Sequence, residues 1–389
     1  MKYKQGAIVI GGHFQGLGLV RALATQGVRV VLVDTEPSAG RFSRYVEKFF
    51  YSPSVLDERN FLEFLIQLGT KRGLDGWVLF PTDDETVFFL SKHREELEKI
   101  FRVTTPEWDV VKYVYNKKLS YPTAEKLGLP IPQTFYPEKI EDLSTFELSF
   151  PVIIKPAVMR DFFRKTGKKV LLARNYDELK VMYKKAIEII QPSDILIQER
   201  IPDVANHLYS FCPFFKNKKV LGKVIAQRIR QHPMDFGHAS TFVKTVNIPE
   251  LEILGTRFLS TINYYGLCEV EFIQDPRDGK FKFLEVNPRI WGWHTIAVRA
   301  GVNLPYLVYL DMMGKELKIK SFKAGIKWIR LVTDLPTALS EIFKGKLGLF
   351  SYLESLKGIN EFAVFSFSDP LPFFGELMRL PYLWKKRGF

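Results

Sequence analysis

The first 34 residues contain the pattern that most restricts how this chain can fold. Residues 7–10 form a short apolar run that ends in a pair of glycines, and residues 17–24 carry apolar side chains at helical spacing. Gly27 ends that helix, and the apolar run 28–33 closes on Asp34. A strand, a glycine turn, a helix and a second buried strand make the βαβ unit of a parallel sheet. The sequence therefore predicts an α/β domain at this end of the chain.

The glycines of the turn do not form a dinucleotide-binding or triphosphate-binding loop. Gly11, Gly12, Gly16 and Gly18 do not produce the G-x-G-x-x-G order, and the turn lacks the Lys and Ser/Thr of a Walker A loop. Asp34 imitates the acid that binds a ribose, but the rest of that fingerprint is missing. We therefore expect a Rossmann-like substrate domain.

A second candidate site follows the strand predicted at 76–80. The polar run 81–85 (Pro-Thr-Asp-Asp-Glu) stands at the carboxyl end of that strand, where open α/β sheets bind ligands. The same run is also typical of the N-cap and acidic first turn of a helix, so a ligand site and a helix start both stay open. The helix runs to about Leu97, and a strand at 101–104 completes the domain.

Length and composition set the wider frame. A chain of 389 residues is too long for one ordinary core and predicts two or three domains. Apolar residues make up 46% and charged residues 25%, which is typical of a folded protein rather than a disordered one. The net charge is +13, but the basic residues are spread out and carry no nucleic-acid-binding motif. Anionic substrates or an anionic membrane surface would suit the same charge, and no nucleic-acid partner is expected.

The expected compartment is the cytoplasm. No apolar run reaches the roughly 18–20 residues that span a bilayer, and residues 1–4 lead straight into a strand without a signal-peptide pattern. Cys212 and Cys268 stand far apart in apolar stretches, as expected for buried free thiols.

The hairpin predicted at 268–287 carries the strongest chemical signal. Glu285 and Asn287 share one face of its second strand because side chains alternate along a strand, and Glu271 joins that face if the turn holds an odd number of residues. Two carboxylates and an amide oxygen amid apolar residues are costly to bury unpaired, and oxygen ligands suit Mg²⁺ together with phosphate. A solvated strand edge is the alternative. The pattern favours a metal site at Glu271, Glu285 and Asn287.

Three cations complete the candidate site. Arg289 would direct a guanidinium at phosphates or at the charge that develops during transfer. Lys155 ends an apolar strand, and Lys117 stands early in a helix. Taken alone, either lysine could be an ordinary surface lysine. The order of all these residues along the chain therefore decides whether they form a site.

In that order the chain resembles the ATP-grasp superfamily, which includes biotin carboxylase, the carbamoyl-phosphate synthetase large subunit and D-alanine–D-alanine ligase. Asn116-Lys117, eleven residues ahead of Gly128, is similar to the family's Asp-Lys helix, and Val-Ile-Ile-Lys-Pro at 152–156 matches its second nucleotide lysine. Residues 195–201 resemble the hinge strand whose backbone reads adenine, and residues 283–289 resemble the metal strand.

The resemblance covers roughly residues 1–315 and implies a domain plan and a ligand set. The plan is a Rossmann-like domain at 1–105, an ATP-grasp domain at 106–317 with a lid at about 122–197, and a C-terminal extension at 318–389. The implied nucleotide ligands are Lys117, Lys155, Gln198, Glu199, Arg200, Ile201, Asp203, Glu271 and Glu285. Magnesium, or manganese in its place, would bind Glu271, Glu285 and Asn287.

Within the superfamily the chain looks closest to a group of bacterial and archaeal carboxylate–amine ligases, and more distantly to D-aspartate ligase. Residues 227–240 support this, because Arg228 and Arg230 are expected on one strand face, where an arginine fork suits a carboxylate. A basic strand edge is the alternative. The residues expected to act in catalysis are Arg289, Arg230 and Lys155. His232 and His238 are expected only to form hydrogen bonds in a loop.

The sequence departs from the family in two places. The segment 157–169 lacks the glycine-rich phosphate loop and is expected to be a basic loop with Arg160, Arg164, Lys165, Lys168 and Lys169. Trp291 and Trp293 follow Arg289 where carboxylases have a polar segment, which argues against bicarbonate and biotin chemistry.

The sequence therefore predicts an ATP-dependent ligase that activates a carboxylate as an acyl phosphate, passes it to an amine or a thiol, and releases ADP and phosphate. A nucleotide-binding or regulatory ATP-grasp protein without activity is the alternative, and a Rossmann oxidoreductase fits less well. The partners are small-molecule carboxylates and amines, and a homodimer is left open. The tail 371–389 is expected to pack on the enzyme because Pro372 and Pro381 interrupt it, with an anionic membrane surface as the other reading.

Overall fold

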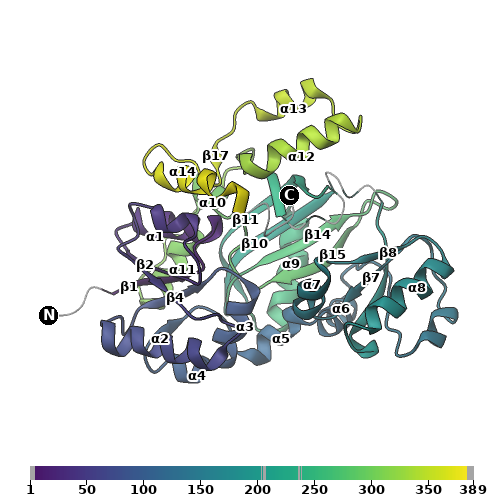
Figure 1. Ribbon diagram of the computed structural model, residues 1–389, viewed down its shortest axis with the longest axis horizontal. Coiled ribbons are helices and arrows are strands. Elements are labelled where there is room, and N and C mark those ends of the chain that lie inside the picture. Colours follow the sequence, from purple (N-terminus) through teal and green to yellow (C-terminus); the bar gives the residue numbers. More distant parts are fainter. Residues whose placement is uncertain (1–4, 203, 205–206, 235–236, 238, 383–389) are drawn as a thin grey trace.

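The computed structural model describes residues 5–202, 204, 207–234, 237 and 239–382. These residues form three β-sheets, and helices cover them (Figure 1). The N-terminal sheet and a small lid sheet lie at opposite ends, and the large central sheet lies between them (Figure 1). The expected mixed α/β architecture is confirmed.

The N-terminal sheet is five-stranded and parallel, with the order β3-β2-β1-β4-β5. Its elements are β1 (Gly6–Ile10), α1 (Phe14–Ala24), β2 (Arg29–Asp34), β3 (Lys48–Tyr51), α2 (Glu58–Arg72), β4 (Val78–Pro81), α3 (Asp84–Lys92), α4 (Arg94–Leu97) and β5 (Arg102–Val103). The predicted βαβ unit is confirmed by the parallel pairing of β1 with β2. The sequence reading did not include β3 and α2.

Asp34 closes the glycine turn after β1. Its Oδ2 accepts a hydrogen bond from the N–H of Gly12 at 2.7 Å. Gly11 has a φ of +95°, and a Cβ there would lie 2.1 Å from Oγ1 of Thr82, so only glycine fits. The carboxylate that imitates a ribose-binding acid therefore holds its own turn.

The central sheet has eight strands in the order β15-β14-β10-β11-β12-β16-β17, and β13 pairs with β10. Its elements up to residue 312 are α5 (Trp108–Tyr115), α6 (Lys117–Lys126), β10 (Leu208–Lys216), β11 (Lys219–His232), β12 (Ala239–Thr245), α9 (Pro249–Thr261), β13 (Gly266–Leu267), β14 (Glu269–Gln274), β15 (Phe281–Asn287), α10 (Thr295–Arg299) and α11 (Leu304–Met312). Helix α9 packs on β10 and β11, and it closes a core in which Phe211, Phe258 and Phe283 are buried. Cys212 and Cys268 are buried and free, as expected.

The lid sheet has four strands in the order β6-β9-β7-β8. Its elements are β6 (Thr134–Phe135), β7 (Val152–Pro156), α7 (Met159–Thr166), β8 (Leu171–Ala173), α8 (Tyr176–Ile187) and β9 (Ile195–Glu199). The segment expected to be a basic loop contains α7, so that expectation is wrong. Phe162 is fully buried in the lid core, and Gly167 ends the helix with a φ of +65°.

The C-terminal residues complete the central sheet. Their elements are β16 (Lys327–Ile329), α12 (Leu331–Phe343), α13 (Leu349–Leu356), β17 (Glu361–Phe362) and α14 (Leu371–Met378). Strand β16 pairs antiparallel with β12, and β17 pairs parallel with β16. The C-terminal extension expected to begin at residue 318 therefore contributes strands β16 and β17 to the central sheet.

This segment also fastens the N-terminal domain. Arg21 on α1 donates hydrogen bonds to Oδ2 of Asp369 at 3.0 Å and to the carbonyl oxygen of Val364 at 2.8 Å. Helix α14 packs on residues 39–42 and buries Gly375 and Glu376, as expected for a tail that packs on the body. The end of the tail, 383–389, lies outside the described residues. Within the described part of the chain, no helix combines the length and apolar character needed to cross a membrane.

Candidate active site

The hairpin of β14 and β15 brings four oxygen-bearing side chains to one face. Glu271 lies opposite Glu285, and Glu269 lies opposite Asn287. Residues opposite each other in an antiparallel pair, and residues two apart in a strand, point to the same side. The expected juxtaposition of Glu271, Glu285 and Asn287 is confirmed, and their role as metal ligands stays a prediction.

Each carboxylate of this face is held by a cation or an amide. Oε2 of Glu285 lies 3.0 Å from Nζ of Lys117 on α6, and Oε2 of Glu271 lies 3.1 Å from Nη2 of Arg228 on β11. Asn287 donates from Nδ2 to Oε1 of Glu271 at 2.9 Å. The positive charge of Lys117 holds the pKa of Glu285 well below its usual range, so this carboxylate is ionised.

Glu269 is a member of the site that the sequence reading missed. Its side chain is buried and accepts hydrogen bonds from Oγ of Ser210 at 3.0 Å and from Nδ2 of Asn287 at 3.3 Å. Burial and the neighbouring charge of Glu271 raise the pKa of Glu269 to about 7. Its position two residues before Glu271 was the available signal, because that spacing places both on one strand face.

Lys155 lies at the end of β7 and is fixed by two neutral groups. Its Nζ donates to Oη of Tyr121 and to Oε1 of Gln198, the latter at 2.7 Å. Tyr121 in turn donates to the carbonyl oxygen of Leu284 at 2.8 Å, which ties the lid lysine to β15. Burial lowers the pKa of Lys155 well below its usual value, and the charge of Lys117 lowers it further. An anion bound beside Lys155 would favour its charged form and raise this pKa again.

The expected hinge strand is β9, and its polar groups are partly engaged. The N–H of Glu199 donates to the carbonyl oxygen of Gln133 at 2.9 Å, and the N–H of Arg200 donates to that of Pro151 at 3.2 Å. The carboxylate of Glu199 accepts a hydrogen bond from Lys282 at 2.9 Å. The backbone N–H groups of Glu199 and Arg200 therefore bind other segments of the lid. Ile201 is buried beside them, and Asp203 lies outside the described residues.

Three adjoining cavities meet at this face. A cavity of about 160 Å³ lies between the lid and the hairpin, a second of about 370 Å³ reaches residues 83–85 of the N-terminal domain, and a third of about 90 Å³ reaches β12. The first has apolar walls from Ile153 of the lid and Leu284 of β15. Glu285 and Lys169 line all three, so they form one continuous cleft.

Lys169 connects the lid to the central sheet across this cleft. Its Nζ donates to the carbonyl oxygen of Gly237, which lies between β11 and β12, at 3.2 Å. Its charge also helps to keep the pKa of Glu285 low. Of the basic residues that were expected to stand in for a glycine-rich loop, the structure places Lys169 in the cleft.

Arg289 links the hairpin to the N-terminal domain. Its Nε donates to Oδ1 of Asp84 at 3.0 Å, and its Nη2 donates to Oδ1 of Asn287 at 3.4 Å. Asp83 caps α3 by accepting from the N–H of Thr86 at 2.8 Å. The interpretation of residues 81–85 as a helix start is confirmed, and because residues 83–85 also line the second cavity, their role in ligand binding stays a prediction.

Arg230 does not join this cleft, and the expected shared face with Arg228 is wrong. A β-bulge between the two residues puts Arg228 opposite Val243 but Arg230 opposite Phe242, so Arg230 turns to the other face of the sheet. There its Nε and Nη2 donate to the two carboxylate oxygens of Asp334, each at 2.9 Å. His232 forms a hydrogen bond from Nδ1 to Thr337 at 2.8 Å, and His238 lies outside the described residues.

The donor set fits a magnesium ion that is completed by phosphate oxygens. Among the described residues, no three His, Cys, Asp or Glu side chains are grouped closely enough to hold an ion by themselves. Magnesium rarely uses an all-protein cage, and it prefers one or two carboxylates with waters and substrate phosphates. Glu271 and Glu285, with Asn287 between them and Arg289, provide that kind of half-site.

Comparison with known proteins agrees with this geometry. Residues 236–317 match the family model described as the ATP-binding domain of the carbamoyl-phosphate synthase L chain. The chain is 25% identical over 276 residues to a D-aspartate ligase from Enterococcus faecium, a match that covers 64% of this chain and 63% of the relative. The chain spans less than two thirds of the length of the curated relatives that it matches, the D-aspartate ligase included.

Solved structures share the fold. The biotin carboxylase domain of 2-oxoglutarate carboxylase from Hydrogenobacter thermophilus, in complex with MgADP and bicarbonate, aligns with a TM-score of 0.65 at 19% identity and covers 82% of this chain and 73% of that one. An L-amino acid ligase from Bacillus licheniformis aligns with a TM-score of 0.62 at 17% identity and covers 80% and 75%. The resemblance to the ATP-grasp superfamily is therefore confirmed, because residues 236–317 match an ATP-binding domain and the chain shares the fold of these solved structures.

Proposed function

We propose that the chain is an ATP- and magnesium-dependent ligase that joins a carboxylate to an amine through an acyl phosphate. The observation that carries the proposal is the single cleft in which Glu271 and Glu285 face Lys117 and Lys155. In this proposal the nucleotide base enters the apolar part of the first cavity, between Ile153 and Leu284. Its phosphates reach the lysines and the hairpin.

The two ends of the cleft suit two substrates. Arg228, Arg289 and Lys169 line the third cavity and provide cations for the acid to be activated. Residues 83–85 line the second cavity with carboxylates, which attract an ammonium group and can accept its proton. The names of D-aspartate ligase and L-amino acid ligase favour an amino acid among the substrates.

The chemistry needs no covalent protein intermediate. The substrate carboxylate oxygen forms a bond to the γ-phosphorus while the bond from that phosphorus to ADP breaks, which gives an acyl phosphate. The amine then forms a C–N bond to the acyl carbon, phosphate leaves with the C–O electron pair, and the amine loses a proton. A magnesium ion on Glu271, Glu285 and Asn287 would neutralise phosphate charge. Lys155 and Arg289 hold the phosphoryl group and the acid in line.

The test is the identity of the nucleotide product. With a screen of amino acids and other small carboxylates, hydroxylamine should trap the activated acid as a hydroxamate, with one ADP and one phosphate formed for each ATP. AMP and pyrophosphate from an active mixture would contradict the mechanism. Tight Mg-ATP binding with no turnover in the whole screen would favour the regulatory alternative, and a thiol product would favour the carboxylate–thiol variant.

A further inference from the structure

Helix α12 is packed with its polar face inward. The residues that it buries are Thr333, Asp334, Thr337, Ala338 and Glu341. Its large apolar residues recur every four positions on the outer face, namely Leu331, Leu335, Leu339 and Phe343. A surface helix of a protein normally does the reverse, because apolar burial is what holds it in place. The outer stripe therefore has no partner within the described part of the chain.

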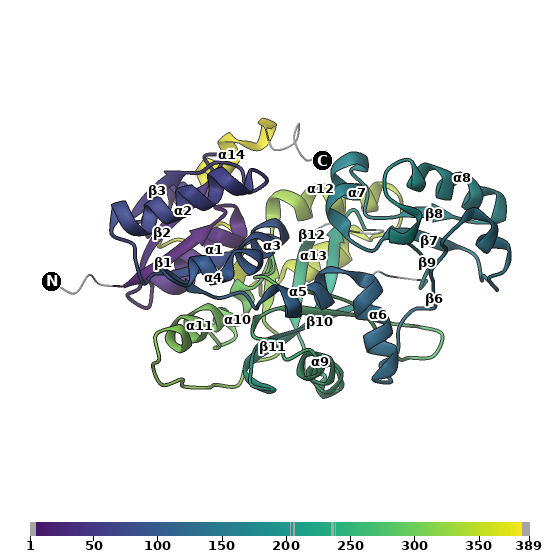
Figure 2. The same cartoon turned by 90° about the horizontal axis from the view of Figure 1, so that it is seen from below.

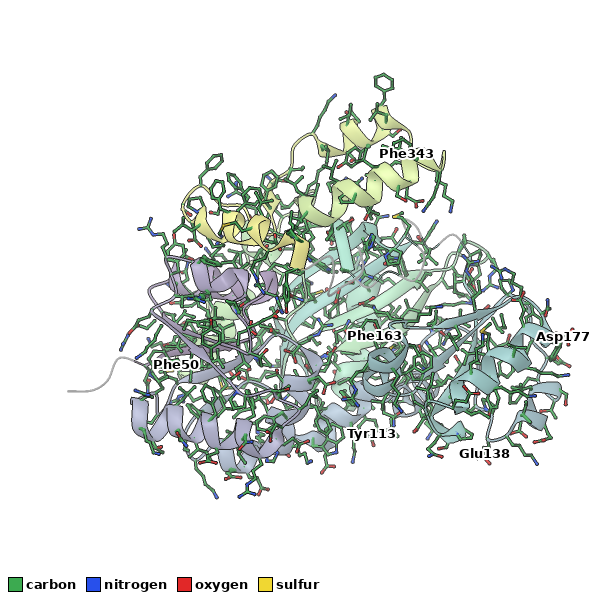
Figure 3. All side chains as sticks on the ribbon, in the orientation of Figure 1. Phe50, Tyr113, Glu138, Phe163, Asp177 and Phe343 are labelled. Atoms are coloured by element: carbon green, nitrogen blue, oxygen red, sulfur yellow. The ribbon has the colours of Figure 1, made fainter. Side chains whose placement is uncertain are left out.

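Helix α13 extends the same surface. Its Tyr352 turns inward, with the guanidinium of Arg230 at 5.0 Å from the ring centroid, while Leu349, Phe350 and Leu353 are exposed. Figures 1 and 2 both show α12 and α13 side by side, and Figure 3 places Phe343 at the outer edge of the molecule. We call the following set the apolar platform: Leu335, Leu339, Phe343, Leu349, Phe350 and Leu353. Single exposed leucines are ordinary, but six large apolar side chains exposed on two neighbouring helices mark a binding face.

Lysines and acids both lie around the platform. Lys344, Lys346 and Lys357 are exposed at its rim, where Lys344 pairs with Glu341 at 2.9 Å and Lys357 pairs with Glu354. Among the described residues, no acid pairs with Lys346. The exposed surface is thus apolar, and its rim keeps a net positive charge on a chain whose net charge is +13.

We propose that the apolar platform binds the headgroup layer of an anionic membrane, independently of the proposed ligase activity. Phe343 and Phe350 are 87% and 86% exposed, so both rings project rather than lie flat against the protein. Projecting rings suit insertion between lipid headgroups, and the lysine rim suits negative lipid charge. A second copy of the chain on the same face would bring two positively charged rims together, and these rims would repel each other.

The experiment measures sedimentation of the full chain with vesicles of phosphatidylcholine, with and without phosphatidylglycerol. The native chain should bind the anionic vesicles, and binding should weaken with salt. In Phe343→Ser/Phe350→Ser, each lost ring should reduce binding by about tenfold or more. Lys344→Glu/Lys346→Glu should lose binding to the anionic vesicles and its salt dependence. The matched control is Ile253→Ser. Ile253 is 59% exposed and belongs to α9, a helix that Figures 1 and 2 show apart from α12 and α13, so this variant should bind like the native chain.

Unchanged melting temperatures in these variants would show that the fold is kept, since all of these side chains are exposed. Absence of vesicle binding by the native chain would overturn the proposal. So would binding that survives both double variants. Light scattering provides the last arm, because a dimer that dissociates in Phe343→Ser/Phe350→Ser without any lipid binding would make the platform a self-association surface instead.

Discussion

Replacing Arg230 should make the protein easier to unfold while leaving the nucleotide site intact. The side chains of Arg230 and Asp334 are 6% and 0% exposed, and two hydrogen bonds of 2.9 Å join them. The guanidinium also stacks on the rings of Phe242 and Tyr352, at 4.3 and 5.0 Å from their centroids. Arg230→Met therefore leaves a buried carboxylate without its partner.

The magnitude follows from the burial of the pair. Removing one member of a buried ion pair costs about 3–5 kcal/mol, because the other charge stays desolvated. With a urea dependence of about 3 kcal/mol per molar for a chain of this size, the midpoint should fall by about 1–1.7 M. Asp334→Asn should do the same, and the double variant should cost less than the sum of the two single changes, because no charge is left unpaired.

The assay is urea unfolding followed by tryptophan fluorescence, together with Mg-ATP binding by the folded variants. Arg228→Met is the matched control, because that arginine is two residues away but contacts Glu271 in the cleft. We expect Arg230→Met to bind nucleotide normally and Arg228→Met to disturb ligand binding. A normal urea midpoint in Arg230→Met, combined with loss of turnover, would refute this reasoning and restore a catalytic role for Arg230.

Three further variants test other parts of the structure. Glu285→Gln should lower Mg-ATP turnover by at least about 10²-fold with the fold intact, and near-native turnover would remove the metal assignment. Lys169→Ala should weaken ATP binding by about tenfold through loss of a charge-assisted contact, whereas the exposed neighbour Lys168→Ala should not, as calorimetry can show. Burial raises the pKa of Glu361 to about 7, so the free energy of unfolding should fall as pH rises from about 4.5 to about 7. Glu361→Gln should flatten that fall in urea titrations at several pH values, and an unchanged slope would contradict this assignment.

The parts of the fold that the sequence predicted are those with a strict local period. The run from residue 7 to Asp34 switches once from strand to helix and back, so apolar spacing alone is enough to locate its elements. The hairpin of Glu271 and Glu285 was equally accessible, because alternation along two strands determines which side chains meet. Glu269 obeys the same rule and could have been included.

The parts that were missed depend on contacts distant in sequence or on breaks in the period. A β-bulge turns Arg230 away from Arg228, and nothing in the local sequence marks the extra residue. Helix α7 forms because Phe162 enters the lid core, which its basic composition conceals. Helix α12 turns its leucines outward because Asp334 must reach Arg230, and this orientation is fixed by tertiary pairing.

The contact between Arg21 and Asp369 has a consequence for synthesis of the chain. The two residues are 348 positions apart, and a ribosome adds roughly 5–20 residues per second. About 17–70 s therefore pass after Arg21 is made before its partner exists. During that interval α1 lacks the contacts of Arg21 with Asp369 and Val364. The N-terminal domain can therefore reach its final packing only after the chain has been made to about residue 369.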